Sequence, residues 1–400
     1  MCSSDLDPRL PVNVSIPPVE GQGGGWEYAQ AVTSPRILAI DVGTGTQDIL
    51  VFEPGTAIEN AVQMIMPSPT MLVAAQVRAA TRDKVDLLLT GVTMGGGPGH
   101  WAIEAHLEQG FQVFATPDAA RTFDDDLERV RAMGIQVVDD GDLVGISARR
   151  IEFRDFEADA VTAALRAFGV PETFDAVAVA VFDHGAAPPG VSDRRFRFEY
   201  LAQQVERGAR LDQFGYLAGE IPSRMTRMLA VARTWTGDAP LFVMDTGPAA
   251  VLGALDDPEV RGAAHITAVN VGNFHTIAFL LDGGRIRGLF EHHTGELTRD
   301  KLERYLDQLV DGTIRNQAVF EDMGHGALEL GSPGWPPDLL AVTGPRRALL
   351  DGSRWNPYLA VPHGAMMIAG CFGLLRGLAG RLPEFKAAIE KELGPPAHLG

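Results

Sequence analysis

The segment "RILAIDVGTGTQDILVF", residues 36–52, places a polar, glycine-rich turn between two apolar stretches. Each apolar stretch has the length and residue types of a buried strand, so we predict strands at Arg36–Asp41 and Asp48–Phe52. A tight hairpin explains the glycines, because such turns need residues that tolerate positive φ. An anion-binding loop explains them equally well, because Gly43 and Gly45 would bring backbone N–H groups close to a ligand. The glycines alone do not decide between these alternatives.

The other residues of this turn favour a ligand site. Thr44 and Thr46 add hydroxyl donors, and Gln47 follows them. Asp41 stands at the end of the first strand, where a carboxylate can hold Mg²⁺, usually through water. We therefore take the segment from Asp41 to Gln47 as a candidate phosphate site, with Asp41 as the candidate metal ligand.

A second copy of this pattern begins at residue 266, with the sequence "ITAVNVGNFHTIAFLL". The two segments align without gaps, and Asn270 then takes the place of Asp41. The second turn supplies Gly272, Asn273 and Thr276 as the counterparts of the first turn's candidates. A duplicated domain with a ligand between its copies would produce this repeat, and two facing turns would hold a polyphosphate from both sides.

The overall composition restricts the class of protein. The chain has 400 residues, 46% of them hydrophobic and 22% charged, which indicates a folded globular protein of two or three domains. The net charge of −18 disfavours nucleic acid and anionic membranes as partners. We see neither an apolar run long enough for a membrane span nor a signal-peptide pattern. Two distant cysteines fit a reducing compartment, so we expect a cytoplasmic location.

The order of elements predicts an α/β protein. Antiparallel strands at the head of each half are followed by strand–helix units. Residues 1–35, rich in Pro and Gly, predict a disordered lead-in, with a sequence artefact at its start as an open alternative. We expect an N-terminal lobe at 36–254 with a specificity-determining insertion at about 111–235, a C-terminal lobe at 255–385, and a tail at 386–400.

Five segments in order carry a resemblance to a known superfamily. They are "DVGTGTQD" (41–48), "DTGPAAVLGAL" (245–255), "NVGNFHT" (270–276), "LLAVTGP" (339–345) and "HGAMMIAGCFGLL" (363–375). They resemble the phosphate-1, first connecting, phosphate-2, adenosine and second connecting motifs of the actin, Hsp70 and sugar-kinase superfamily. The resemblance implies a duplicated ribonuclease H-like fold, in which two lobes hold ATP and Mg²⁺ between them. It also implies that Gly344 lies near the adenosine and that the two connecting helices form a hinge.

Three shorter segments carry a narrower resemblance. "LTGVTMGGGPG" (89–99), "VFDHG" (181–185) and "EHHTG" (291–295) resemble an uncharacterised family of this fold, often labelled as pyruvate formate-lyase activating enzymes. Such activases hold a radical S-adenosylmethionine cluster with three closely spaced cysteines. Cys2 and Cys371 cannot hold that cluster, so the sequence argues against radical chemistry in this chain.

Departures from the superfamily motifs keep the function open. The second turn begins with Asn270 where Asp is usual, Gly344-Pro345 replaces Gly-Gly, and Gln47 stands where Hsp70-like proteins have Lys. These changes favour ATP binding over efficient hydrolysis. Three alternatives follow: ATP hydrolysis or phosphoryl transfer to a small molecule, a nucleotide-gated switch that acts on a partner enzyme such as a glycyl-radical system, and a degenerate member that binds a metabolite.

Four residues at strand ends are candidates for catalysis. Asp183 and His184 follow one very apolar strand and Asp245 ends another, which is where α/β folds place ligand chemistry. His293 shares a strand face with Glu291, so it is a candidate contact for a substrate or the γ-phosphate. Turn caps and helix N-caps are the structural alternatives for these residues.

The remaining chemical signals are weak. The loop "TMGGGPG" (93–99) is neither a Walker loop nor G-x-G-x-x-G, so we expect a close-approach loop in the wall of the cleft. Most other histidines show no His-x-x-x-His or cysteine pairing, so their spacing gives no reason to expect a zinc site. They are His100, His106, His265, His275, His325 and His363.

Overall fold

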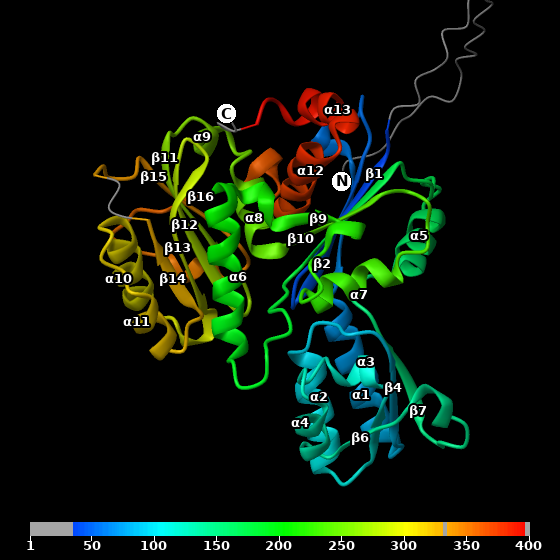
Figure 1. Cartoon of the computed structure of the whole chain (residues 1–400). Coiled ribbons are helices and arrows are strands. Elements are labelled where there is room, and N and C mark those ends of the chain that lie inside the picture. The colour runs from blue at the N-terminus through cyan, green and yellow to red at the C-terminus, as the bar shows by residue number, and fades with distance from the viewer. Residues whose placement is uncertain (1–34, 331–333, 397–400) are drawn as a thin grey trace, which may run out of the picture. The chain divides into compact units, whose positions relative to one another are not determined.

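The computed structural model describes residues 35–330 and 334–396, and Figure 1 shows its helices and strands. All but the last residue of the lead-in predicted for 1–35 lies outside these ranges. Three sheets organise the described chain. No helix in these ranges is both long and apolar enough to cross a lipid bilayer.

The first sheet forms around the hairpin that opens the described chain. Its strands in spatial order are β3 (Val62–Pro67), β2 (Thr46–Phe52), β1 (Ile37–Val42), β8 (Ala176–Val181), β10 (Leu241–Asp245) and β9 (Gly215–Leu217). β1, β2 and β3 are antiparallel neighbours, and β8 and β10 continue the sheet parallel to β1. The strands predicted at Arg36–Asp41 and Asp48–Phe52 are therefore confirmed.

The second sheet repeats this topology. Its strands in spatial order are β14 (Gly326–Glu329), β13 (Arg285–His293), β12 (His275–Asp282), β11 (His265–Val271), β15 (Leu339–Thr343) and β16 (Tyr358–Leu359). β11, β12 and β13 are consecutive in the chain and antiparallel, like β1, β2 and β3 of the first sheet. β15 and β16 extend the sheet on the other side of β11 and run parallel to it. This repeated order is the duplicated ribonuclease H-like topology of the actin-like fold, so the predicted fold class is confirmed.

The third sheet is parallel and has its own hydrophobic core. Its strands in spatial order are β6 (Ile135–Val137), β5 (Val113–Ala115), β4 (Leu87–Gly91) and β7 (Arg149–Phe153). The accompanying helices are α1 (Pro69–Asp83), α2 (Pro98–Glu108), α3 (Pro117–Ala120) and α4 (Leu127–Ala132). Val77, Leu89 and Ile103 are fully buried in this separate core. The domain boundaries expected from the sequence stay a prediction.

Two helices pack directly against each other between the first and second sheets. α8 (Thr246–Ala254) follows the first sheet but packs on β11 and β15, whereas α12 (Ala369–Arg381) follows the second sheet but packs on β1 and β8. A Cβ added at Gly253 would lie 1.7 Å from the carbonyl oxygen of Ala369, and one at Gly373 would lie 1.9 Å from that of Ala249. Only glycine permits such close backbone contact at these two positions.

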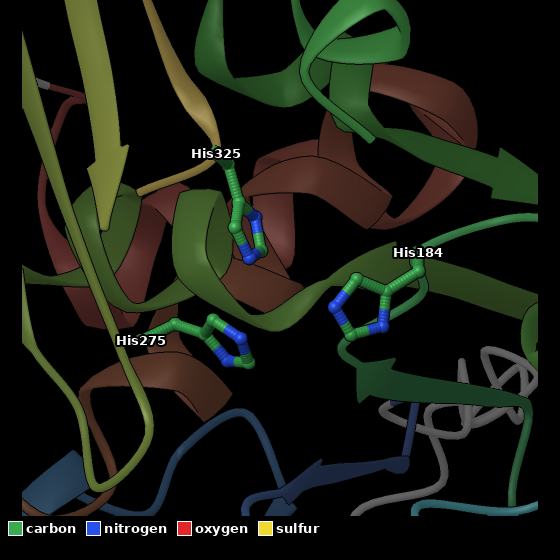
Figure 2. A group of neighbouring side chains, drawn as sticks. All are labelled: His184, His275 and His325. Atoms are coloured by element: carbon green, nitrogen blue, oxygen red, sulfur yellow. The ribbon is translucent and has the colours of Figure 1, made fainter. Parts of the chain in front are cut away.

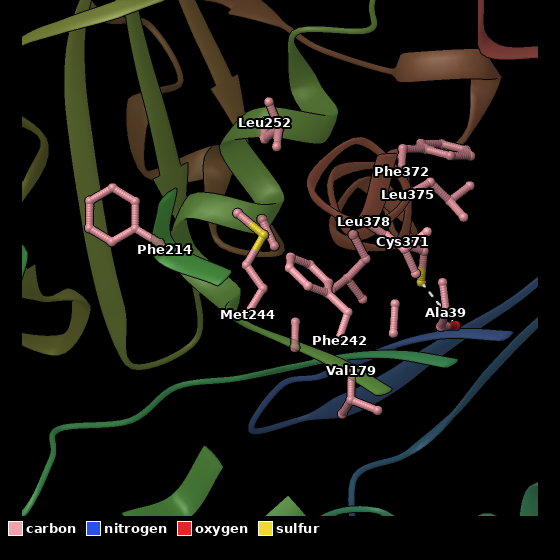
Figure 3. Packing of buried hydrophobic residues seen from close by; sticks show 14 of the residues in the cluster. Ala39, Val179, Phe214, Phe242, Met244, Leu252, Cys371, Phe372, Leu375 and Leu378 are labelled. Atoms are coloured by element: carbon pink, nitrogen blue, oxygen red, sulfur yellow. Dashed lines mark hydrogen bonds between the residues drawn. The ribbon is translucent and has the colours of Figure 1, made fainter. Parts of the chain in front are cut away.

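The main hydrophobic core surrounds α12. Figure 3 shows Leu378 of this helix beside Phe242 of the first sheet. Phe372 and Leu375 of the same helix belong to the same core. The other described helices are α5 (Ala158–Ala167), α6 (Asp193–Gly208), α7 (Thr226–Thr234), α9 (Pro258–Arg261), α10 (Arg299–Val310), α11 (Asn316–Glu321) and α13 (Pro383–Leu393). Short 3-10 helices lie at Ile58–Asn60, Asp140–Asp142, Leu211–Phe214, Ala218–Glu220, Thr294–Glu296, Arg347–Leu350 and Pro362–Gly364.

Candidate functional site

Both glycine turns line a single cavity of about 420 Å³. This volume lies within the usual range for small-molecule sites. The predicted site residues that line it are Asp41, Gly43, Thr44, Thr46, Asp183, His184, Gly272, Asn273 and Gly344. The loop predicted to form part of the cleft wall does line the cavity through Thr93 to Gly97, and a Cβ at Gly97 would lie 2.6 Å from the ring of Phe274.

The two turns have the same backbone bond and face each other. The N–H of Gly43 donates to the carbonyl of Thr46 at 2.9 Å, and the N–H of Gly272 donates to the carbonyl of His275 at 3.0 Å. A Cβ added at Gly45 would lie 2.8 Å from the side-chain nitrogen of Asn273. Because the N–H of Gly43 is used in the bond that closes its turn, it is not free to bind an anion. The next residue, Thr44, lines the cavity.

Paired carboxylates distinguish the first turn. Asp41 and Asp48 lie directly opposite each other in the hairpin, and both line the cavity. Thr246 donates its hydroxyl to Asp41 at 2.6 Å, whereas Oδ1 of Asp48 is buried without a hydrogen-bond partner in the described structure. Burial, reinforced by the charge of Asp245, raises the pKa of Asp41 to about 6. Burial and then the charge of Asp41 raise the pKa of Asp48 to about 8.

Strand alternation separates two predicted residues from the cavity. Gln47 donates its side-chain amide to the carbonyl of Pro67 at 3.0 Å, and Thr276 shares a 2.9 Å hydroxyl contact with Thr294. Each follows a cavity-lining residue by one position and therefore points to the opposite face of its strand. The same rule identifies Asp48, which is not among the predicted site residues. Roles in cofactor binding for Gln47, Thr276 and Gly45 stay predictions.

Asp183 and Asp245 have the capping roles that were their structural alternatives. Asp183 accepts 2.8 Å hydrogen bonds from the N–H groups of Gly185 and Met228. Asp245 accepts from the N–H of Gly247 at the start of α8 and also forms an ion pair. Both carboxyl groups are almost fully buried. Because their oxygens are occupied, a catalytic role for either would require these contacts to open.

A buried ion network joins the first and second sheets beside the cavity. Arg197 of α6 pairs with Asp245 at the end of β10 and, at 2.9 Å, with Glu291 of β13. All three side chains are at most 1% exposed. Burial alone would raise the pKa of Glu291, but the charges of Arg197 and His325 hold it well below its usual range. Arg197 is not among the residues predicted from the sequence, because its charged neighbours resemble a solvated helix face.

Histidines from separate segments meet at one side of the cavity. His184 follows β8, His275 begins β12, and His325 precedes β14; their ligand atoms all lie within 4.8 Å of one another (Figure 2). Nε2 of His293 lies 3.2 Å from Nε2 of His325, and neither of these two histidines lines the cavity, whereas His184 and His275 do. Burial, with a smaller contribution from His325, lowers the pKa of His184 and His275 well below the usual value. His292 lies on the opposite face of β13, against Tyr305.

Residues 94–349 match the model of the family described as "Putative pyruvate format-lyase activating enzyme (DUF1786)". The chain belongs to this family. The narrower resemblance read from the sequence is therefore confirmed, and the matched residues of this family member include the second turn, the ion network and the histidines. No curated protein matches the chain significantly.

Several solved structures are similar to this family member at low identity. A ROK hexokinase from Thermus thermophilus is 13% identical, with 86% of this chain and 99% of that chain covered and a TM-score of 0.32. The ethanolamine utilization protein EutJ from Carboxydothermus hydrogenoformans is 11% identical, with 85% and 89% covered and a TM-score of 0.29. MreB5 of Spiroplasma citri, bound to ADP, is 12% identical, with 90% and 99% covered and a TM-score of 0.30.

Proposed function

We propose that this chain binds ATP with Mg²⁺ in the cavity and hydrolyses it or transfers its γ-phosphate. One observation carries the proposal: two glycine turns meet at a single cavity, and one of them presents paired carboxylates. Polyphosphate sites need backbone close to the ligand and a cation that offsets the phosphate charge.

The residues present fit Mg²⁺ and a polyphosphate. Within the described chain, no Lys or Arg forms an ion pair with Asp41 or Asp48, and one oxygen of Asp48 has no partner. A divalent cation would therefore compensate two buried carboxylates that the protein itself leaves uncompensated. A Cβ at Gly370 would lie 1.9 Å from Asp41, so glycine allows the start of α12 to approach this carboxylate.

Positioning would account for most of the chemistry. Thr44 and Thr46 would donate hydroxyl hydrogen bonds from one turn, Asn273 would donate from the other, and Gly344 would pass beside the adenosine. The cation supplies charge neutralisation when it is bound, as in other phosphoryl-transfer sites. The contact of α8 with α12 would act as the hinge on which the two halves close.

A nucleotide-gated switch is the second candidate. Asn270 lines the cavity where the first turn has Asp41, and the carboxyl groups of Asp183 and Asp245 are engaged as caps. A site short of free catalytic carboxylates would bind nucleotide and turn it over slowly. Its output would then be a conformation recognised by a partner enzyme, for which a glycyl-radical system is the candidate that the family label suggests.

The test is calorimetry of ATP binding with Mg²⁺, followed by measurement of ADP release from the same sample. We expect the wild-type chain to bind, and Asp41→Ala to weaken binding by at least about tenfold, because a charge-assisted contact is lost. Asp300→Ala is the matched control, since Asp300 is 85% exposed and remote from the lining residues.

Three outcomes separate the alternatives. Binding with ADP release supports a phosphotransferase or ATPase and leads to a screen for a metabolite that accelerates turnover. Binding without release supports the switch and leads to a search for a protein that accelerates turnover. Absence of binding, or binding that Asp41→Ala leaves unchanged, overturns the proposal in favour of a metabolite site without nucleotide.

A further inference from the structure

We propose that His184, His275 and His325 form a site for a divalent transition metal ion, with Zn²⁺ as the best match. The three rings come from the loop after β8, the start of β12 and the residue before β14, and they converge on one space (Figure 2). This site uses none of the residues proposed to hold Mg²⁺ or the nucleotide, so it stands apart from the proposed function.

The spacing of the ring nitrogens is close to that of a metal site. Zn–N bonds of about 2.0–2.1 Å in a tetrahedron place neighbouring nitrogens about 3.3 Å apart. The candidate ligand atoms here all lie within 4.8 Å of one another. Side-chain rotations that move each ring by about 1 Å would close the set. In the described structure, neither His184 nor His275 uses a ring nitrogen in a hydrogen bond, so these nitrogens are available to a metal ion.

The hydrogen bond to Glu291 prepares His325 as a ligand. Its Nδ1 lies 2.6 Å from Oε2 of Glu291, and this carboxylate is held ionised by Arg197. Nδ1 therefore donates to this carboxylate, and Nε2 is the ring nitrogen left to face a metal ion. A carboxylate behind a metal-binding histidine fixes its tautomer and orientation in the same way in many metal sites.

His293 provides an independent indication of a cation. Its Nδ1 lies 2.8 Å from the carbonyl oxygen of Met323, which can only accept, so this nitrogen donates and Nε2 holds the lone pair. That Nε2 lies 3.2 Å from Nε2 of His325. Two lone pairs at this distance repel unless a cation or an additional proton lies with them. The distance also matches the edge of a tetrahedral site, so His293 adjoins the three candidate ligands through His325.

The surroundings orient the rings and select the ion. Phe182 stacks on His275 with 4.0 Å between ring centroids and 6° between ring planes, and it meets His184 edge-on. The nearby charge of Arg197 is balanced by Asp245 and Glu291, so it does not exclude a cation. A ligand set of imidazoles without carboxylates suits Zn²⁺, Co²⁺ or Ni²⁺ and does not suit Mg²⁺ or Ca²⁺.

The test uses the full chain, stripped with a chelator and titrated with Co²⁺ in the absence of nucleotide. We expect visible absorption bands that saturate at one equivalent, and Zn²⁺ should displace the Co²⁺. His184→Ala and His275→Ala should each lower the Co²⁺ affinity by at least about tenfold. These two are the informative variants, because His325 is built into the ion network and its replacement can disturb folding.

Two controls keep the outcome specific. His265→Ala removes a half-buried histidine at the far end of β11 and should leave the Co²⁺ bands unchanged. Asp41→Ala should also retain them, which distinguishes this site from the proposed nucleotide site. Absence of Co²⁺ bands, or equal affinity in the His184→Ala/His275→Ala double variant, overturns the proposal and assigns the His293–His325 contact to a shared proton.

Discussion

The two glycine turns share a backbone hydrogen bond but differ in the side chains that they present. In each, a glycine N–H closes the turn onto a carbonyl three residues later. The positions occupied by Asp41 and Thr46 in the first turn are occupied by Asn270 and His275 in the second. Carboxylates therefore gather at the first turn and imidazoles at the second, although both turns line the same cavity.

This difference shows that the repeated loop determines the positions of the side-chain ligands, whereas the residue types at those positions determine which ion they prefer. Oxygen donors favour Mg²⁺, whereas imidazole nitrogens favour transition metals. The predictions below test whether the two turns work as one assembly, whether their ion preferences are separate, and whether one turn can be given the chemistry of the other.

The largest expected effect comes from breaking the ion network that joins the two halves. Arg197→Met leaves Asp245 and Glu291 buried without their common partner, and such a loss costs about 3–5 kcal/mol of unfolding free energy. Urea unfolding of the wild-type chain and of Arg197→Met measures this difference in unfolding free energy. Arg210→Met, which breaks a more exposed pair with Asp212, should cost less than about 1 kcal/mol. Similar losses in both variants would show that the buried network does not hold the halves together.

The second prediction separates the ion preferences of the turns. Asp48→Ala should weaken binding of ATP with Mg²⁺ by about tenfold or more, because it removes the buried carboxylate oxygen that has no hydrogen-bond partner in the described structure. The Co²⁺ bands should stay intact, because Asp48 lies at the first turn. His275→Ala should abolish most of the Co²⁺ signal. Calorimetry of ATP binding with Mg²⁺ and absorption spectroscopy of bound Co²⁺, each on both variants, measure the two effects. If each variant lost both signals, the two turns would form one coupled site.

The third prediction gives the second turn the carboxylate of the first. Asn270→Asp places a second acidic group on the cavity wall, so ATP turnover should rise by about tenfold if a missing carboxylate limits hydrolysis. Initial rates of ADP release measure the effect. Asn60→Asp adds the same charge at an exposed position outside the cavity and should not change the rate. Unchanged turnover in Asn270→Asp would favour the switch, in which slow hydrolysis has another cause.

The smallest expected effect concerns acidic residues at the cavity wall. Burial, followed by the charges of Asp193 and Asp124, raises the pKa of Asp125 to about 6. The folded chain then keeps a proton that the unfolded chain loses, so this carboxyl group reduces stability as pH rises from about 4 to about 6. Asp125→Asn should therefore add about 1 kcal/mol at pH 7.5, a value reduced for partial exposure, and nothing below pH 4. Urea midpoints at both pH values test the sign, and Asp300→Asn is the control.

The fold could be predicted because its evidence is local. Apolar alternation around the turn at Gly43, and its repeat around Gly272, specify two hairpins that head two similar sheets. Asp48 could also have been identified, since it alternates with Thr46 and lies opposite Asp41. Gln47 and Thr276 were selected from motif positions without that alternation, which is why their side chains face away from the cavity.

The histidine cluster could not be predicted, because its geometry is entirely tertiary. His184, His275 and His325 belong to three strand ends that only the folded sheets bring together. Metal motifs are readable in a sequence when ligands share one helix or turn, and these do not. Arg197 escaped prediction for a related reason: its burial is set by carboxylates on two other elements and not by the pattern of its own helix.

The placement of Cys371 gives the protein a chemical reporter of its own motion. This thiol lies in α12 and is within donating distance of the carbonyl oxygens of Ala39 (Figure 3) and Asp48, so it touches both strands of the first hairpin. It is fully buried, and burial raises its pKa well above the usual value, with a further contribution from Asp41. An alkylating reagent can reach it only when α12 separates from β1. The rate at which Cys371 is labelled would therefore report how often α12 separates from β1, without an introduced cysteine.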